Sequence, residues 1–159
     1  MTPQYLSKQR LKLWIRLLRV TRLGEAELRE FLRAEHATTL PRFDVLAALH
    51  RAGEEALTMS ELSRQLLVSN GNTTTVVDRL ETDGFVTRTP SARDRRVVHV
   101  ALTTAGHRHF EELAIEHESR VDELFADVDA VDLAALEDLL HRMTPRRTTT
   151  AQLAPRGNP

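Results

Sequence analysis

The sequence predicts a mostly α-helical fold that carries one small β-hairpin. The central stretch, residues 57–102, has the pattern of two short helices followed by two alternating strands around an arginine-rich turn. The segments on both sides of it show helical periodicity over long runs. Aromatic residues make up only 4% of the chain, so the core must consist mostly of Leu, Val and Ala, which favours helices.

The composition is that of one soluble globular domain. The chain has 159 residues, of which 41% are hydrophobic and 28% are charged. It contains no cysteine, which excludes disulfides, thiolate metal sites and mechanisms that depend on cysteine oxidation. No apolar run approaches the roughly 20 residues that span a membrane, and the first ten residues lack the apolar centre of a signal peptide. We therefore expect a cytoplasmic protein.

The net charge of −1 conceals an asymmetry along the chain. Residues 4–33 hold eight bases and three acids, whereas residues 107–143 hold eleven acids and three bases. A neutral total therefore does not exclude a polyanionic partner, because local patches decide such binding.

Residues 5–35 are predicted to form one long helix. Apolar side chains recur at helical spacing from residue 11 to residue 18, and others widen this face enough to indicate burial on more than one side. Pro41 marks the start of a second helix, because proline is favoured in a first turn. That helix should stop near Gly53, a residue suited to the left-handed conformation after a helix end.

The central stretch begins with a strong helix-start signal. Thr58 at the N-cap and Glu61 three residues later match a capping box. Leu57 and Leu62 lie where a hydrophobic staple would close over it. This helix should run to about Leu67.

The next helix should open at Val68 and Ser69 and run to about Thr82, where Asp83 and Gly84 end it. Its buried side is predicted to consist of Thr73, Val76, Val77 and Leu80.

Residues 85–89 and 96–102 alternate as the two strands of a hairpin, joined by the turn-rich sequence PSARD. The tip of this hairpin is strongly basic. It holds one acid, Asp94, against Arg88, Arg93, Arg95 and Arg96.

Two helices are predicted after the hairpin. Thr103 can cap the first, whose apolar residues keep a heptad rhythm from Phe110 to Val128, as in a helix packed along another helix. Asp132 should cap the second, and Pro145 should end it. Its inward-facing residues are predicted to be Leu136, Leu139, Leu140 and Met143. The remaining tail has little apolar content and is predicted to be disordered.

The helix of residues 69–82 has an outward face that suits DNA. Its side chains are short and polar, whereas a merely solvated face more often carries long Glu and Lys at i, i+4. Small side chains let a helix backbone approach the bases in the major groove. The arginine tip suits the minor groove, whose negative potential attracts guanidinium groups. Helix, turn, helix and basic hairpin together form the layout of a winged helix-turn-helix. The candidate DNA-contacting residues on the helix are Ser69, Asn70, Gly71, Asn72, Thr74, Thr75 and Arg79.

The chain resembles a known family from about residue 8 to residue 143. The segment SNGNTTTVVDRLETDGFV, followed by RDRRVVHVALTTAG, is similar to the MarR family of bacterial transcription regulators. The most specific part is a D-x-R wing followed by the L-T-x-x-G start of the next helix at residues 102–106.

This resemblance implies roles for the wing. Arg96 is expected to reach into the minor groove, and Asp94 to hold it by a charge-assisted pair. Arg93 and Arg95 are expected to contact phosphates or the groove. The resemblance also implies a two-fold dimer on a pseudo-palindromic DNA site. The implied organisation is an N-terminal dimerisation helix (1–35), a DNA-binding lobe (36–103), C-terminal dimerisation helices (104–144) and a disordered tail (145–159).

Asp78 does not fit this face simply, because phosphates repel a carboxylate. It can orient Arg79, accept a hydrogen bond from a cytosine amine, or be an ordinary acid on a helix surface.

The resemblance further implies a small-molecule pocket, often for anionic aromatic ligands. Trp14 could stack on a ring, Arg16 could pair with a carboxylate, and Asp44 could form a charge link that the ligand disrupts. The alternative is structural, because a tryptophan on a helical stripe is more often part of the core.

The histidines raise the question of a zinc site. His107 and His109 are two residues apart and so do not share a helix face. No H-x-x-x-H pair exists and cysteine is absent, so we expect neither a metal site nor a cofactor. The histidines considered are His36, His50, His99, His107, His109, His117 and His141.

The sequence thus predicts a homodimeric, sequence-specific DNA-binding repressor that a small ligand releases. A ligand-independent repressor or activator, or a winged helix used for protein contacts, is the alternative. An enzyme is not expected, because the chain shows no nucleophile–base arrangement and no Gly-rich phosphate loop.

Overall fold

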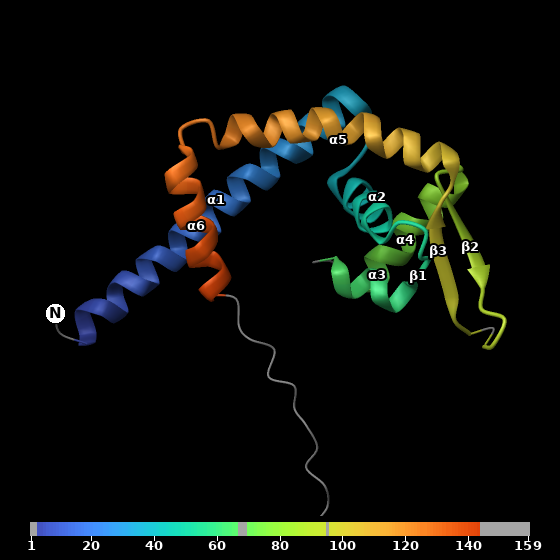
Figure 1. Cartoon of the computed structure of the whole chain (residues 1–159), viewed down its shortest axis with the longest axis horizontal. Coiled ribbons are helices and arrows are strands. Elements are labelled where there is room, and N and C mark those ends of the chain that lie inside the picture. Colours follow the sequence, from blue (N-terminus) through green and yellow to red (C-terminus); the bar gives the residue numbers. More distant parts are fainter. Residues whose placement is uncertain (1–2, 67–69, 95, 144–159) are drawn as a thin grey trace, which may run out of the picture. The chain divides into compact units, whose positions relative to one another are not determined.

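The computed structural model describes residues 3–66, 70–94 and 96–143, whose helices and strands are drawn in Figure 1. They belong to two compact units, Met1–Leu124 and Phe125–Pro159. Within the described residues, the first unit holds five helices and a three-stranded sheet, and the second holds one helix. This confirms the predicted fold class.

Helix α1 (Pro3–His36) and helix α2 (Leu40–Ala52) lie close to their predicted bounds. A turn at Ala37, where φ is 50°, separates them. Pro41 stands in the first turn of α2, where its missing N–H costs no hydrogen bond. Gly53 ends α2 with a φ of 65°, a conformation that strains any residue with a side chain.

Helix α3 (Met59–Gln65) begins with the predicted capping box. The N–H of Glu61 donates to Thr58 Oγ1 (3.2 Å), and the N–H of Thr58 donates to the Glu61 carboxylate (2.9 Å). The Thr58 hydrogen bonds lower the pKa of Glu61, because they favour its ionised form. The expected last residue, Leu67, lies outside the described residues.

Helix α4 (Asn70–Thr82) ends where predicted, and Gly84 follows it with a φ of 77°. Its expected opening residues, Val68 and Ser69, lie outside the described residues. α3 and α4 together supply the helix-turn-helix.

The sheet contains one strand more than the predicted hairpin. Strands β2 (Val86–Pro90) and β3 (Val98–Leu102) pair antiparallel, and β3 starts two residues later than expected. Strand β1 (Leu57–Thr58) pairs with the other edge of β3, giving the order β1-β3-β2. Two residues are too few to show an alternating pattern, so the sequence did not reveal β1.

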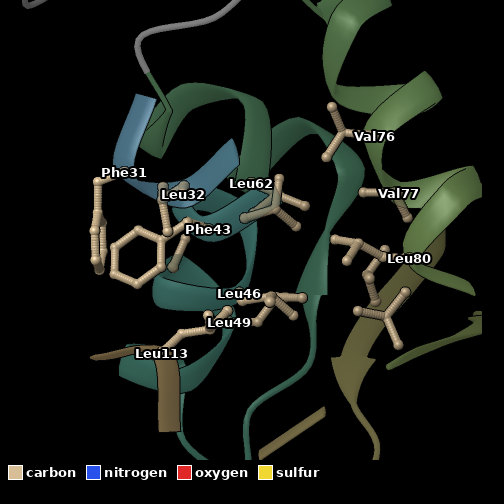
Figure 2. Close-up of a cluster of buried hydrophobic side chains, with 14 residues drawn as sticks. Phe31, Leu32, Phe43, Leu46, Leu49, Leu62, Val76, Val77, Leu80 and Leu113 are labelled. Atoms are coloured by element: carbon tan, nitrogen blue, oxygen red, sulfur yellow. The ribbon is translucent and has the colours of Figure 1, made fainter. Parts of the chain in front are cut away.

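The core lies among α1, α2, α3, α4, α5 and the sheet, as Figure 2 shows. Leu and Val dominate it, as the scarcity of aromatic residues predicted. Its fully inaccessible apolar members are Leu32, Leu46, Leu62, Val77, Leu80 and Val100.

Helix α5 (Thr104–Leu124) begins with the predicted cap. The N–H of Gly106 donates to Thr103 Oγ1 (3.0 Å), while the Thr103 hydroxyl donates to the carbonyl of Gly84 (2.7 Å). Thr103 therefore joins the start of α5 to the turn that ends α4. The prediction that the helical rhythm continues to Val128 was wrong, because α5 stops at its last heptad leucine.

Gly106 is required by close approach to another backbone segment. A Cβ at this position would lie 1.9 Å from the Phe85 carbonyl oxygen, so the chain would have to move. We expect Gly106→Ala to lower the free energy of unfolding by about 3 kcal/mol, as overpacking does.

Gly24 of α1 supplies the matched control, since a Cβ there would meet only Leu124 Cδ1 at 3.8 Å. Gly24→Ala should raise the free energy of unfolding by up to about 1 kcal/mol, because alanine is the better helix former. Urea unfolding of both variants measures this difference. Equal stability of the two would contradict the assigned contact.

The second unit contains helix α6 (Ala130–Met143). The predicted cap, Asp132, was wrong: Asp129 Oδ1 accepts from the N–H groups of Val131 and Asp132 (2.9 Å each), so the helix starts earlier. The apolar face of α6, which was predicted to point inward, is not buried within the single chain. Leu139, Leu140 and Met143 are 43–53% exposed, and no residue of α6 is buried.

The apolar stripe of α1 is exposed as well. Leu11, Trp14 and Ile15 are 55–59% exposed, so the predicted burial on more than one side does not occur within one chain. In the described part of the protein, no helix is both long enough and apolar enough to cross a membrane.

Candidate nucleic-acid interface

Helix α4 presents one face to the core and the opposite face to solvent. The buried residues are those predicted, Thr73, Val76, Val77 and Leu80. Because these four fix the rotation of the helix, its polar side chains project outward. The exposed residues are Asn72, Thr74, Thr75, Asp78, Arg79, Glu81 and Thr82.

The first turn of α4 is formed by Asn70 and Gly71. Ser69, expected to cap this helix, and Arg95, expected in the wing, lie outside the described residues. Six of the eleven candidate contact residues lie on α4, namely Asn70, Gly71, Asn72, Thr74, Thr75 and Arg79.

The wing between β2 and β3 is closed by backbone hydrogen bonds. The N–H of Ser91 donates to the Val97 carbonyl (2.8 Å), and the N–H of Val97 donates to the Asp94 carbonyl (2.9 Å). Arg93 and Arg96 are exposed on this tip. It therefore offers guanidinium groups at the end of a hydrogen-bonded hairpin.

Asp94 shapes the tip through the backbone. Its Oδ1 accepts a hydrogen bond from the main-chain N–H of Arg96 (2.9 Å). The described residues show this contact instead of the expected pair between the Asp94 carboxylate and the Arg96 guanidinium. The Arg96 side chain is thereby left extending from a turn that Asp94 stabilises.

Arg88 of β2 is a residue whose role the sequence did not disclose. Its guanidinium lies 2.5 Å from Asp78 and 3.4 Å from Glu81, and Nη2 donates to the Thr74 carbonyl (3.4 Å). Its side chain is only 24% exposed. Arg88 therefore fastens the wing strand to three successive turns of α4.

This contact also accounts for Asp78. The structure pairs its carboxylate with Arg88, not with Arg79. Acids at positions 78 and 81 share a helix face, which is the signal that could have indicated a buried cation between them.

A second ion pair holds the far end of α4. The Arg42 guanidinium of α2 contacts the carboxylate of Asp83, which follows the helix directly. The Arg42 side chain is 20% exposed. Together with Arg88, it fixes α4 against both the helical core and the wing.

The three predicted ligand residues are not brought together. Asp44 lines a hollow of about 270 Å³ among α1, α2 and the end of α3. Trp14 and Arg16 do not line it and are exposed on α1. Burial raises the pKa of Asp44, the negative charge of Glu25 raises it further, and Arg29 opposes this.

Two of the histidines pack as rings. His117 stacks on Phe43 with ring centres 4.1 Å apart, and His109 stacks on Phe85 at 4.2 Å. Burial lowers the pKa of both imidazoles. Among the described residues, no cluster of three or more His, Asp or Glu side chains could hold a metal ion.

Comparison with known proteins agrees with this geometry. Residues 38–98 match the model of the MarR family. The crystal structure of a Cys-to-Ser mutant of Escherichia coli MarR in complex with operator DNA is 30% identical, covers 86% of this chain and 96% of that chain, and has a TM-score of 0.74. Wild-type apo MarR from E. coli is 32% identical, with coverage of 82% and 96% and a TM-score of 0.69.

Curated relatives are transcriptional regulators too. PecS of Dickeya dadantii is 31% identical over 102 residues, which are 64% of this chain and 61% of PecS. YkoM of Bacillus subtilis, described as an uncharacterized HTH-type transcriptional regulator, is 32% identical over 92 residues, 58% of each protein. The chain thus spans about three fifths of the length of these two relatives. The combination of α4, the D-x-R wing and these similarities leads to one conclusion: the chain belongs to the MarR family of DNA-binding transcriptional regulators.

Proposed function

We propose that this protein is a homodimeric repressor that binds a pseudo-palindromic operator and leaves it when a small ligand binds. The observation that carries the proposal is the exposed polar face of α4 beside an arginine-bearing wing. The E. coli MarR structure with operator DNA, at 30% identity, supports the choice of DNA as the partner.

The length of each side chain indicates which part of the DNA it would contact. Asn72, Thr74 and Thr75 are short enough to let the α4 backbone approach base edges in the major groove. Arg79 is long enough to reach a phosphate or a base edge. Arg96 at the wing tip suits the narrower minor groove, where the negative potential is strongest.

Dimerisation is supported by apolar surface that the single chain leaves uncovered. Large exposed apolar patches on soluble proteins mark interaction sites. α1 exposes Leu11, Trp14 and Ile15, and α6 separately exposes Val131 and Leu139. The basic excess of residues 4–33 and the acidic excess of residues 107–143 would complement each other between two copies.

Release by a ligand is supported by the hollow that includes Asp44, since a ligand confined there would contact both α1 and the DNA-binding lobe. The family resemblance points to anionic aromatic effectors.

Replacing Arg96 by Ala tests the proposal. Affinity for the DNA upstream of the protein's own coding region should fall by roughly 1–3 kcal/mol, because one groove contact is lost. Fluorescence anisotropy at several salt concentrations measures the change, with scrambled DNA as competitor, since phosphate contacts make affinity salt-dependent.

Arg142→Ala is the matched control, because it removes the same charge from an exposed residue of α6 that pairs only with Asp138 among the described residues. It should leave DNA affinity unchanged. If the two variants bound DNA equally well, the wing would have no role in binding.

A further inference from the structure

One face of α2 lines the hollow beside Asp44. Asp44, Ala47, Ala48 and Arg51 of α2 all line it, at the i, i+3, i+4, i+7 spacing of a single helix face. The two alanines in the middle create the space, because neither has a side chain to fill it. A charged residue of opposite sign stands at each end.

Asp44 and Arg51 are seven residues apart, which is about 10 Å along a helix that rises 1.5 Å per residue. Neither makes a hydrogen bond or an ion pair with another residue in the described part of the chain. Their charges are therefore available to a third molecule.

The Asp44 end of the hollow is electronegative. Glu25 of α1 lines the same hollow, and its charge adds to the burial that already disfavours an ionised Asp44. Arg29 also lines the hollow, but its guanidinium pairs with the Glu25 carboxylate at 3.4 Å, so two carboxylates share one cation at this end. A cation placed here would relieve the repulsion between the two carboxylates.

We propose that this hollow binds a small amphoteric molecule, with a protonated amine against Asp44 and a carboxylate or similar anion against Arg51. Its middle is apolar or aromatic, because Ala47 and Ala48 are the lining residues of α2 between the charged ends, and the apolar residues Leu40, Pro41 and Leu66 also line the hollow. The volume of about 270 Å³ lies just below the roughly 300–1,000 Å³ of typical ligand sites, so the molecule is small.

A ligand with one charge fits this arrangement less well. A plain aromatic anion can use Arg51, but it leaves Asp44 beside Glu25 with no new cation. A plain amine satisfies Asp44 and leaves Arg51 unpaired. Only a molecule with both charges matches both ends.

The site also reaches the end of α3, the first helix of the helix-turn-helix. Gln65 and Leu66 line the hollow, and Leu66 stands four residues before Asn70, the first residue of α4. A ligand that packs against Leu66 would therefore contact the end of α3, next to α4 in the sequence. This regulatory part rests on the proposed function, whereas the binding site does not.

The test uses the full chain and 4-(aminomethyl)benzoate as probe, with 4-methylbenzoate and 4-methylbenzylamine as matched compounds lacking one charge. We expect a saturable rise in melting temperature with the first compound, since a native-state ligand stabilises the fold. The single-charge compounds should need at least tenfold higher concentrations for the same rise.

Two variants locate the site, Asp44→Asn and Arg51→Gln, and each should lose at least tenfold in probe affinity. Asp44→Asn is expected to fold, because it removes a charge that burial disfavours. Glu27→Gln removes an exposed carboxylate of α1 outside the hollow and should respond like the parent protein. The inference is overturned if no probe raises the melting temperature, if 4-methylbenzoate works equally well, or if the response survives Asp44→Asn.

DNA binding is then measured with and without the probe. A tenfold loss of affinity for the upstream DNA supports both the site and its regulatory role. A probe that binds but leaves DNA affinity unchanged supports the site and contradicts release by this ligand. A chain that binds the probe but never binds the upstream DNA contradicts the proposed function alone.

Discussion

Replacing Leu11 and Ile15 together by Glu should convert the protein into a monomer. Both side chains lie on the exposed stripe of α1, at 59% and 55% exposure, and together with Trp14 they make apolar surface that a single chain leaves in water. Burying a carboxylate in an apolar interface without a partner is strongly unfavourable, so two copies could no longer associate there. Light scattering coupled to size-exclusion chromatography measures the mass.

The loss of DNA affinity should be larger than for any single contact residue. Two linked reading units gain roughly 10²–10⁴-fold in affinity over one, because the second binds intramolecularly. The double variant should therefore lose affinity for the upstream DNA by about 10²-fold or more. Circular dichroism should be unchanged, since both positions are exposed in the folded chain.

Ala56→Glu is the control, because it places the same charge on an exposed residue before β1, outside α1 and outside the C-terminal helices expected to dimerise. It should keep the mass of the parent protein. A Leu11→Glu/Ile15→Glu protein that still formed dimers at micromolar concentration would place the dimer interface elsewhere.

Arg88→Ala should weaken both the fold and the binding of DNA. The substitution leaves Asp78 and Glu81 without the cation between α4 and β2. Removing one partner of a buried ion pair costs about 3–5 kcal/mol, whereas exposed pairs are worth at most about 1 kcal/mol. Because Arg88 is partly buried and its partners are about half exposed, we expect a loss of about 1–2 kcal/mol in urea unfolding.

The effect on DNA should be about tenfold, or about 1.4 kcal/mol. Two carboxylates of the reading helix would then face the phosphates uncompensated, and the wing strand would lose its attachment to α4. A double-mutant cycle with Asp78→Asn isolates the contact, and a coupling free energy near zero would exclude it. Arg79→Ala serves as the comparison, because it should lower DNA affinity without lowering stability.

The helices and their ends were predictable because their signals are local. The Thr58–Glu61 capping box, Gly53 and the Thr103 cap each depend on residues within four positions of one another, and each is confirmed. The Asp132 cap was wrong for a related reason. Asp129 offers the same chemistry three residues earlier, and the sequence alone does not rank two such aspartates.

Long-range contacts were harder to anticipate. Arg88 looked like one more base of the wing, yet its partners stand on a helix seven to fourteen residues away. The two residues of β1 gained strand geometry only by pairing with β3. The apolar faces of α1 and α6 were correctly recognised, but pattern alone did not say that the single chain leaves them uncovered.

The candidate site, too, could be predicted from the sequence only in part. The outward face of α4 follows from the periodicity of its buried residues, so the position of its exposed polar side chains was predictable. The ligand residues were not, because Trp14 and Asp44 stand on different helices and only Asp44 reaches the hollow. The charged residues that line the hollow with Asp44, namely Glu25, Arg29 and Arg51, are ordinary helix-surface residues in the sequence.

The contact at Gly106 has a mechanical consequence. Between the first turn of α5 and the Phe85 carbonyl there is room for hydrogen atoms only, and Thr103 ties both to Gly84. A layer of side chains would absorb small displacements by changing rotamers, but two backbones in direct contact have no such compliance. We therefore expect a tilt of α5 to shift the turn at the end of α4 as well, because the backbone at Gly106 has little room to move independently of Phe85.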